Sequence, residues 1–336
     1  MTQTRIQMRK INGVPIEAST KLSALSGGEV LKWDASTGNM VWEDQDGFAY
    51  TPFTFQGSNY GYSLGGDGNN TIIEKFTFAS AGNTSDVADL TGGRGNNIAG
   101  TLSVTHGYSI GGLSNDIIDR FTFAADANAV DVGDLTANRS HMASASDGDY
   151  GYIAGGAGKL NIIERFANAS SSDSADVGDI TVGRTEPTGH SSTTHGYAAG
   201  GDAEEVKHDV IDKYSFASSG NGTDWGDISA NSSGGSAGSD TTHGYVAGGN
   251  TPSSYVNIIE RFPFASDSGV SDVGDLTRVI TWASGQSSTT TGYKCGGHPN
   301  GSTINEMEYY SFASSGNGAD WGDLTAASKY NAGVQY

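Results

Sequence analysis

Side chains that could perform acid–base or metal chemistry recur at regular intervals along the chain. Three histidines, His106, His195 and His243, each stand directly before a Gly-Tyr pair. Carboxylates three residues apart could bind Ca²⁺ or act as an acid and a base, but aspartate ahead of glycine in a turn usually accepts hydrogen bonds from its own backbone. We therefore predict turn-stabilising roles for both sets and leave calcium binding open. The aspartate pairs are Asp86/Asp89, Asp131/Asp134, Asp176/Asp179, Asp224/Asp227, Asp272/Asp275 and Asp320/Asp323.

The arginines and the single cysteine also follow the periodic pattern. Arg94, Arg139 and Arg184 come after Leu-Thr or Ile-Thr, and we expect them to pair with acidic residues such as Glu164 and Glu260. Cys295 stands where other units have alanine, which predicts a small buried side chain. The chain has no glycine-rich phosphate loop, Cys/His metal spacing or nucleophile elbow. We predict a protein that is not an enzyme, with no catalytic residue, metal site or cofactor.

The elements that must position these side chains are six copies of one repeat. The Gly-Tyr pair recurs at Tyr62, Tyr108, Tyr152, Tyr197, Tyr245 and Tyr293, with spacings of 46, 44, 45, 48 and 48 residues. A period of roughly 40–50 residues with several short strands per unit is typical of a propeller. Each unit reads as four short antiparallel strands, with a double glycine ending the second. Residues 328–335 are in register with a first strand, so we expect them to close the ring beside Tyr60–Leu64.

The repeat resembles the kelch family of β-propellers from about Pro52 to the C-terminus. The features that carry this resemblance are the double glycine and the tyrosine before it. A tryptophan in the later strand is present only as Trp225 and Trp321, while the other units have valine there. The resemblance implies an all-β fold, a six-bladed kelch-like β-propeller over residues 49–336, preceded by a short N-terminal anchoring segment with a β-hairpin.

The loops after the double glycine differ from unit to unit and should emerge on one face. A polar patch with an aromatic side chain is common on surfaces that contact carbohydrate or protein. We therefore predict contact with a host-surface glycan or protein through this loop face. The alternative is that these are surface loops whose variation is tolerated because they bind nothing. The predicted binding residues are Glu204, Glu205, His208, Tyr255, His298 and Asn300.

Charge excludes two classes of partner for the main body. The chain has 38 acidic and 18 basic side chains, a net charge of -20. Such a surface repels phosphate backbones and anionic lipid heads, so we expect no nucleic-acid binding. No apolar run approaches the roughly 20 residues of a membrane span, so we expect no membrane insertion.

The first 48 residues do not match the repeat and differ in charge. Up to Trp33 they carry five basic residues and two acidic ones, a difference of +3. Residues 29–34 and 39–43 read as two strands joined by a turn at 35–38. Such a hairpin is marginal alone, so its tryptophans need a cover, which we expect to be a neighbouring chain. The predicted docking residues of this segment (1–48) are Arg5, Arg9, Lys10, Trp33 and Trp42.

Within this segment, Ala24-Leu-Ser-Gly-Gly-Glu-Val-Leu-Lys-Trp-Asp34 resembles a stretch near the start of structural and tail-fibre proteins of tailed bacteriophages, especially marine ones. The resemblance implies a non-enzymatic virion protein, assembled in the host cytoplasm, whose N-terminus docks on other virion proteins and whose propeller is displayed for host attachment. Decoration of a head or tail, a cellular kelch-like protein-binding scaffold and a glycan-active propeller enzyme are the alternatives. A homo-oligomer is also compatible with the sequence.

Overall fold

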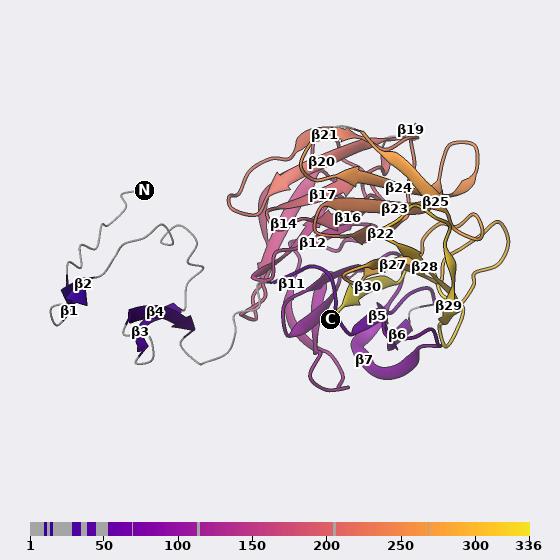
Figure 1. The fold of residues 1–336 in the computed structure, drawn as a ribbon. Helices are drawn as coiled ribbons and strands as arrows, with labels where there is room; N and C mark the ends of the chain where they lie inside the picture. The colour runs from indigo at the N-terminus through magenta and orange to yellow at the C-terminus, as the bar shows by residue number, and fades with distance from the viewer. Residues whose placement is uncertain are drawn as a thin grey trace. The chain divides into compact units, whose positions relative to one another are not determined.

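The computed structural model describes residues 53–336 except 69, 113–114, 204–205 and 268, together with the backbone of four short strands nearer the N-terminus (Figure 1). The chain divides into two compact units, residues 1–52 and residues 53–336. The boundary that we predicted at 48/49 falls outside the described residues. In the described part there is no helix, and hence none long and apolar enough to cross a membrane.

The first unit contains two strand pairs. The predicted hairpin is confirmed: β3 and β4 pair antiparallel, from Glu29 opposite Asp44 to Asp34 opposite Asn39, which leaves four residues for the turn. The side chains of the predicted docking residues lie outside the described part of the chain. The strands are β1 (Lys10–Ile11), β2 (Val14–Pro15), β3 (Glu29–Asp34) and β4 (Asn39–Asp44).

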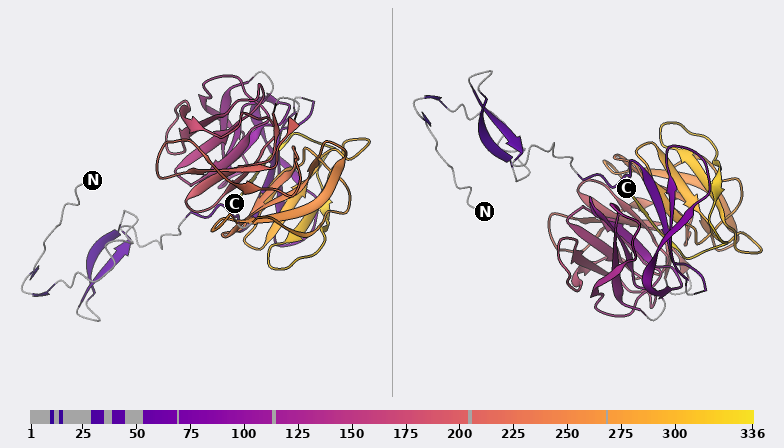
Figure 2. Two further views of the ribbon diagram at one scale, coloured as in Figure 1. Left: turned by 90° about the horizontal axis from the view of Figure 1, so that it is seen from above. Right: turned by 90° about the horizontal axis from the view of Figure 1, so that it is seen from below.

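The second unit is a six-bladed β-propeller, as the repeat predicted. It consists of six four-stranded antiparallel sheets arranged in a ring (Figures 1 and 2). Blade 1 contains β30 (Ala332–Gln335), β5 (Tyr60–Leu64), β6 (Asn70–Thr77) and β7 (Ser85–Arg94). Blade 2 contains β8 (Ala99–Leu102), β9 (His106–Ile110), β10 (Ile117–Thr122) and β11 (Val130–Asp134). Blade 3 contains β12 (Ala143–Ser146), β13 (Tyr150–Ala154), β14 (Ile162–Ala167) and β15 (Ala175–Asp179).

The other three blades follow the same order. Blade 4 contains β16 (Thr188–Ser191), β17 (His195–Ala199), β20 (Val210–Ser215) and β21 (Thr223–Asp227), with a small extra pair, β18 (Asp202–Ala203) and β19 (Val206–Lys207). Blade 5 contains β22 (Ser236–Ser239), β23 (His243–Asn250), β24 (Tyr255–Pro263) and β25 (Ser271–Asp275). Blade 6 contains β26 (Ser284–Ser287), β27 (Thr291–Cys295), β28 (Glu306–Ser311) and β29 (Ala319–Asp323).

The C-terminal strand closes the ring, which confirms the prediction made from its register. Strand β30 pairs antiparallel with β5 and places Val334 opposite Tyr62. Both side chains are buried, Val334 completely so. Because the last strand completes the first sheet, the two ends of the repeat array meet inside one blade, and Figure 2 shows the first and last strands side by side.

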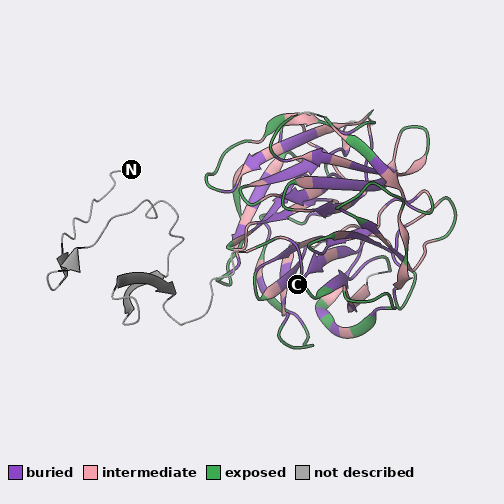
Figure 3. Ribbon diagram, viewed as in Figure 1, coloured by how far each residue is buried: buried purple, intermediate pink, exposed green. Residues whose placement is uncertain are grey.

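The Gly-Tyr pair is explained by packing between blades. In blade 5, a Cβ on Gly244 would lie 2.3 Å from the ring of Phe262 in the adjacent strand, so only glycine fits. The next residue, Tyr245, is 1% exposed and packs on Phe312 of blade 6, with ring centroids 4.4 Å apart. The pair therefore seats one aromatic ring within its own blade and sends another into the next, and buried residues follow the strands throughout (Figure 3).

The strand order gives the propeller two different faces. Each inner strand, the first in its blade, runs from the upper face to the lower face. The upper face carries the loops after the double glycines and the linkers, which are the segments between the last strand of one blade and the inner strand of the next. The lower face carries the tight turns between the first two strands of each blade. The upper face is therefore where the variable residues gather.

Candidate functional site

The repeated aspartates and histidines have local structural roles. In blades 2 to 6, the first aspartate of each pair accepts a hydrogen bond from a glycine amide two residues on, for example Gly133 N to Asp131 Oδ1 at 3.1 Å. Each repeated histidine has Nδ1 within 2.8 Å of the hydroxyl of the preceding threonine. The described residues include no group of three His, Cys, Asp or Glu placed to hold a metal ion. The predicted turn-stabilising role is confirmed for the three histidines and for the aspartate pairs of blades 2 to 6, whereas the Asp86/Asp89 pair of blade 1 has Ala88 in place of that glycine.

The three repeated arginines are buried, and each joins its linker to the next blade through an ion pair. Arg94 pairs with Asp119 and Arg184 with Asp212, each at 2.7 Å, and Arg139 pairs with Glu164. The prediction that Glu260 would also have an arginine partner is wrong. Glu260 accepts hydrogen bonds from the amide and hydroxyl of Ser229 instead. The linker into blade 5 has Ser232 at the position where the linkers into blades 2, 3 and 4 have arginine. Cys295 is fully buried, as predicted.

The structure brings two of the predicted binding residues together on the upper face. The rings of Tyr255 and His298 lie 6.2 Å apart, and both lie against Trp282, at 6.1 and 5.7 Å. His208 is half-buried in the blade 4 loop, and Asn300 is exposed. Glu204 and Glu205, between β18 and β19, lie outside the described residues. The partner that joins the first two, Trp282, was not among the predicted site residues.

Trp282 belongs to a ring of six equivalent residues at the upper end of the central channel. We call this set the channel-mouth ring; its members are Asn97, His141, Glu186, Gly234, Trp282 and Tyr330. All six have a left-handed backbone, with φ between 48° and 66°. Around most of the ring each residue's amide donates to the carbonyl of the one before, at 2.7–3.0 Å, and Ile98 N closes the circle onto Tyr330 O at 3.3 Å.

The backbone conformation of this ring favours glycine, but five of its six positions carry larger side chains. A left-handed backbone costs a non-glycine residue roughly 1–2 kcal/mol, more readily borne by Asn than by Trp or Tyr. The ring geometry repeats in every blade, while its residue type is different in all six. Strain of this kind gathers at functional sites. The ring is therefore the strongest candidate site on the propeller.

The ring divides into a polar half and an aromatic half. In the polar half, His141 Nε2 lies 3.8 Å from Glu186 Oε1, and Glu186 Oε2 accepts a hydrogen bond from Ser233 at 3.0 Å. Burial lowers the pKa of His141, although the Glu186 carboxylate opposes this shift. In the aromatic half, the rings of Trp282 and Tyr330 lie 4.9 Å apart. Burial first, and the Glu186 charge second, raise the pKa of Tyr330 to about 12, so Tyr330 remains a neutral hydroxyl.

A cavity of about 100 Å³ lies beneath the ring and occupies the channel. Its wall is the second residue of each inner strand, and all six are small. At the four glycines among them any side chain would collide with a neighbouring strand, since a Cβ on Gly285, for example, would lie 1.9 Å from Ala237 O. Phe55 also lines the cavity. The six wall residues are Gly100, Ser144, Gly189, Ala237, Gly285 and Gly333.

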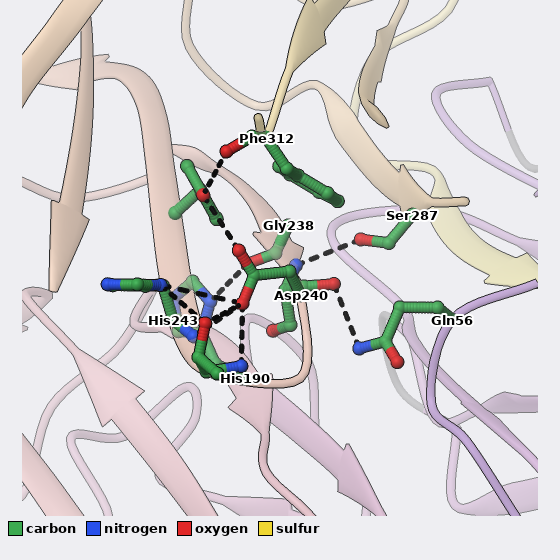
Figure 4. Close-up of polar contacts among 10 residues, drawn as sticks. Gln56, His190, Gly238, Asp240, His243, Ser287 and Phe312 are labelled. Carbon is green, nitrogen blue, oxygen red and sulfur yellow. Dashed lines mark hydrogen bonds and ion pairs between the residues drawn. The ribbon is translucent and has the colours of Figure 1, made fainter. Parts of the chain in front are cut away.

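Residues 53–57 cross the lower end of this channel, and we call them the strap. Gln56 Nε2 donates to Ser239 O at 3.0 Å, and Gly57 N donates to Ser287 O at 2.8 Å. Figure 4 shows Gln56 and Ser287 on the same side of the segment that holds Asp240, each hydrogen-bonded to the backbone of Ser239 in β22. Beside them Asp240 accepts from the backbone amides at 242 and 243 and so ends the strand. The chain therefore enters the propeller at the end opposite the channel-mouth ring.

A buried histidine lies near the same lower end, between blades 4 and 5. His190 is 0% exposed; its Nδ1 lies 3.0 Å from Gly238 O and its Nε2 lies 3.1 Å from the hydroxyl of Thr188 (Figure 4). Since a carbonyl only accepts, Nδ1 carries the proton, and Nε2 and Ala199 O, the latter at 3.2 Å, are the two acceptors for the single hydroxyl proton of Thr188. Burial lowers the pKa of His190 to about 4, so the ring is neutral at pH 7.

Sequence reasoning missed the channel-mouth ring because it searched for repeated residues and for long loops. The ring residues do have a sequence signal: in blades 2 to 6 they stand eleven positions before the repeated tyrosine, as Trp282 does before Tyr293. Aligned on that tyrosine, this position never has the same residue twice, but neither does the position that follows it. The left-handed backbone that makes the position significant could not be predicted from the amino-acid sequence.

Comparison with known proteins adds no family to this picture. The sequence matches no protein-family model, and no curated protein is significantly similar to it.

Proposed function

We propose that the protein is a non-enzymatic component of a tailed-phage particle, which attaches through residues 1–52 and displays the channel-mouth ring for contact with the host, as a tail-fibre or host-attachment protein does. The observation that carries this proposal is the separation of strap and ring. The chain enters at the lower end of the channel, where Gln56 is bonded to Ser239, and the ring surrounds the upper end.

This separation favours display. A pull on the chain at the N-terminal side of the strap acts on the lower face, at the end of the channel opposite the ring. The strap is fixed at several points, including the bond from Gln335 Nε2 to Phe55 O at 2.7 Å. Gln335 lies in β30, the strand that closes the propeller. A load on the N-terminal segment is thus transmitted to the blade that joins both ends of the repeat array.

The link to a virus particle comes from the resemblance of residues 24–34 to an adaptor stretch of phage virion proteins. Residues 1–33 form a basic segment, with five basic and two acidic side chains, in contrast to the net charge of -20 for the whole chain. Opposite charges speed and orient association between proteins. The segment therefore suits a negatively charged partner that the acidic propeller itself would repel.

A binding role fits the ring better than hydrolysis does. Glycoside hydrolases generally place two carboxyl groups on either side of the bond that they cleave. Glu186 is the single carboxylate among the six ring residues. It already accepts a hydrogen bond from Ser233 and lies beside His141. These contacts hold the carboxylate in place as a hydrogen-bond acceptor.

The test is particle assembly with and without the N-terminal segment. Host cells that produce the particles would express either the full chain or a chain that begins at residue 53, and purified particles would be probed with an antibody against the propeller. We expect the full chain in the particles and the shortened chain, still soluble and folded, in the unbound fraction. Equal incorporation of both chains would contradict the proposal.

A further inference from the structure

We infer that the channel-mouth ring binds the terminal residue of an uncharged glycan, inserted end-on into the channel. One face of the sugar would lie against Trp282 and Tyr330, and its hydroxyl groups would bond to Glu186, His141 and Asn97. This inference rests on the proposed function, because it names the ligand that the displayed face takes. Its support comes from the two halves of the ring, the cavity beneath them and the charges around them.

The aromatic half is a fixed surface. Trp282 lies against Tyr330, at 4.9 Å, and against His298, at 5.7 Å. On its other side it lies over Gly234, since a Cβ there would come within 2.9 Å of Trp282 Nε1. Aromatic faces held in this way offer a large contact area with little loss of side-chain freedom. A sugar ring, with one apolar face of C–H groups, matches such a surface.

The polar half faces the aromatic half across the ring, and the two halves touch where the rings of His141 and Tyr330 lie edge-on, 5.7 Å apart. In ring order, His141 is opposite Trp282 and Glu186 is opposite Tyr330, three positions apart in each case. A carboxylate accepts hydrogen bonds at both oxygens, and an amide both donates and accepts. Within the described residues the Asn97 side-chain amide has no protein partner, so its donors and acceptor are free. The set provides what neighbouring hydroxyl groups of one sugar need.

The shape of the site favours a terminal residue over an extended chain. The cavity of about 100 Å³ is a single hole lined by the inner strands, with Phe55 among its lining residues. It would take roughly three waters at the volume of the liquid, and therefore part of one sugar ring. The small wall residues, such as Gly285, bring the inner strands too close together for a polymer to pass. A peptide strand would need an extended groove.

The charges select an uncharged sugar. The charges around the ring are mixed, and most of them pair with one another: Asp67 with Lys329, and Asp202 with Lys207. Glu186 has no lysine or arginine partner among the described residues, so an anionic sugar at the ring would meet an uncompensated carboxylate and be repelled. A cationic ligand would be repelled by Lys329, whose ammonium lies 5.5 Å from the Trp282 ring centre and 5.1 Å from that of Tyr330.

The experiment measures binding of the full-length chain to an array of immobilised glycans that end in glucose, galactose, mannose or N-acetylglucosamine, with sialylated and sulfated glycans beside them. Trp282→Ala and Glu186→Gln test the two halves. The matched control is Trp225→Ala on the outer rim, where Trp225 Nε1 donates to Pro263 O at 3.2 Å. Thermal unfolding of each variant would verify that it is folded.

We expect binding to one or more uncharged termini, with the dissociation constant raised about tenfold or more by each ring variant, the equivalent of one lost good contact. The control should remain within about twofold of the parent chain. Binding confined to acidic glycans, or ring variants that bind like the parent, would overturn the inference.

Attachment of assembled particles to host cells separates failure of this inference from failure of the proposed function. If no glycan binds but Trp282→Ala particles lose attachment, the ligand is a protein: the glycan inference is wrong and the proposed function stands. If particles without the chain attach to cells normally, the host-contact role is wrong, whatever the array shows.

Discussion

In all six linkers a Ser or Thr amide donates to a buried acidic side chain of the next blade, and the two halves of the channel-mouth ring differ in what is added to that contact. The linkers that carry Asn97, His141 and Glu186 are each fixed by a buried arginine, two or three residues earlier, that pairs with the next blade. The linkers that carry Gly234, Trp282 and Tyr330 have Ser232, Ile280 and Ser328 at the arginine position. There the side chains at the mouth pack on one another, as in the contact between Trp282 and Tyr330.

This difference follows from what each half presents to solvent. Polar side chains at a mouth gain little from contact with each other, because water competes for every hydrogen bond. Their position must therefore be fixed by the linker backbone, which the buried arginine joins to the next blade. Aromatic side chains gain free energy by packing, so the surface that they present also anchors them. The same fold can thus carry a site that is polar on one side and aromatic on the other.

The largest effect should come from breaking one of the arginine anchors. Arg184 and Asp212 are both 0% exposed, and Arg184→Met would leave the aspartate charge buried without its partner. Removal of one member of a buried pair costs about 3–5 kcal/mol. We expect a fall of this size in the free energy of unfolding, measured with urea at pH 7.

A surface pair provides the control for that measurement. Arg278 and Glu306 lie 2.7 Å apart, but their side chains are 43% and 34% exposed. Exposed pairs contribute less than about 1 kcal/mol, so Arg278→Met should change the free energy of unfolding little. Equal losses in the two variants would show that the buried pairs are not anchors.

A pH-dependent effect of intermediate size is expected where the two halves meet. His190 of blade 4 donates to Gly238 of blade 5, and its folded-state pKa is about 4, against an ordinary value of 6.5. The unfolded chain therefore takes up a proton that the folded chain refuses. Stability present above about pH 6.5 is lost as the pH falls towards 4, by about 3 kcal/mol at most, from 1.36 kcal/mol per pKa unit.

The measurement compares urea unfolding of the parent chain and of His190→Gln between pH 4 and pH 7. The many carboxylates contribute in both chains, so the histidine appears in the difference between the two curves. That difference should change progressively between pH 6.5 and 4. Parallel curves over this range would mean that His190 is not held neutral in the folded protein.

The sequence predicted what the repeat enforces and missed what departs from it. Closure by β30 was predictable because residues 328–335 are in register with the first strand of the other units. His190 was not, because its inner-strand position has a different residue in each blade and its partner is a backbone carbonyl of the neighbouring blade. Trp282 was missed for a third reason: its importance comes from its φ angle of 57°, which is set by the linker geometry and not by the amino-acid sequence around it.

The smallest effect should come from the ring itself, and it distinguishes the two means of support. Glu186→Gly relieves a left-handed backbone worth roughly 1–2 kcal/mol and loses the hydrogen bond from Ser233, worth about 1 kcal/mol, so the free energy of unfolding should change by no more than about 1 kcal/mol. Trp282→Gly relieves the same strain but also loses its packing on Tyr330 and His298, so it should be the less stable variant by about 1–2 kcal/mol. Urea unfolding at pH 7 measures both. The opposite order would mean that the linker contacts alone hold the aromatic half, and that the packing at the mouth does not support it.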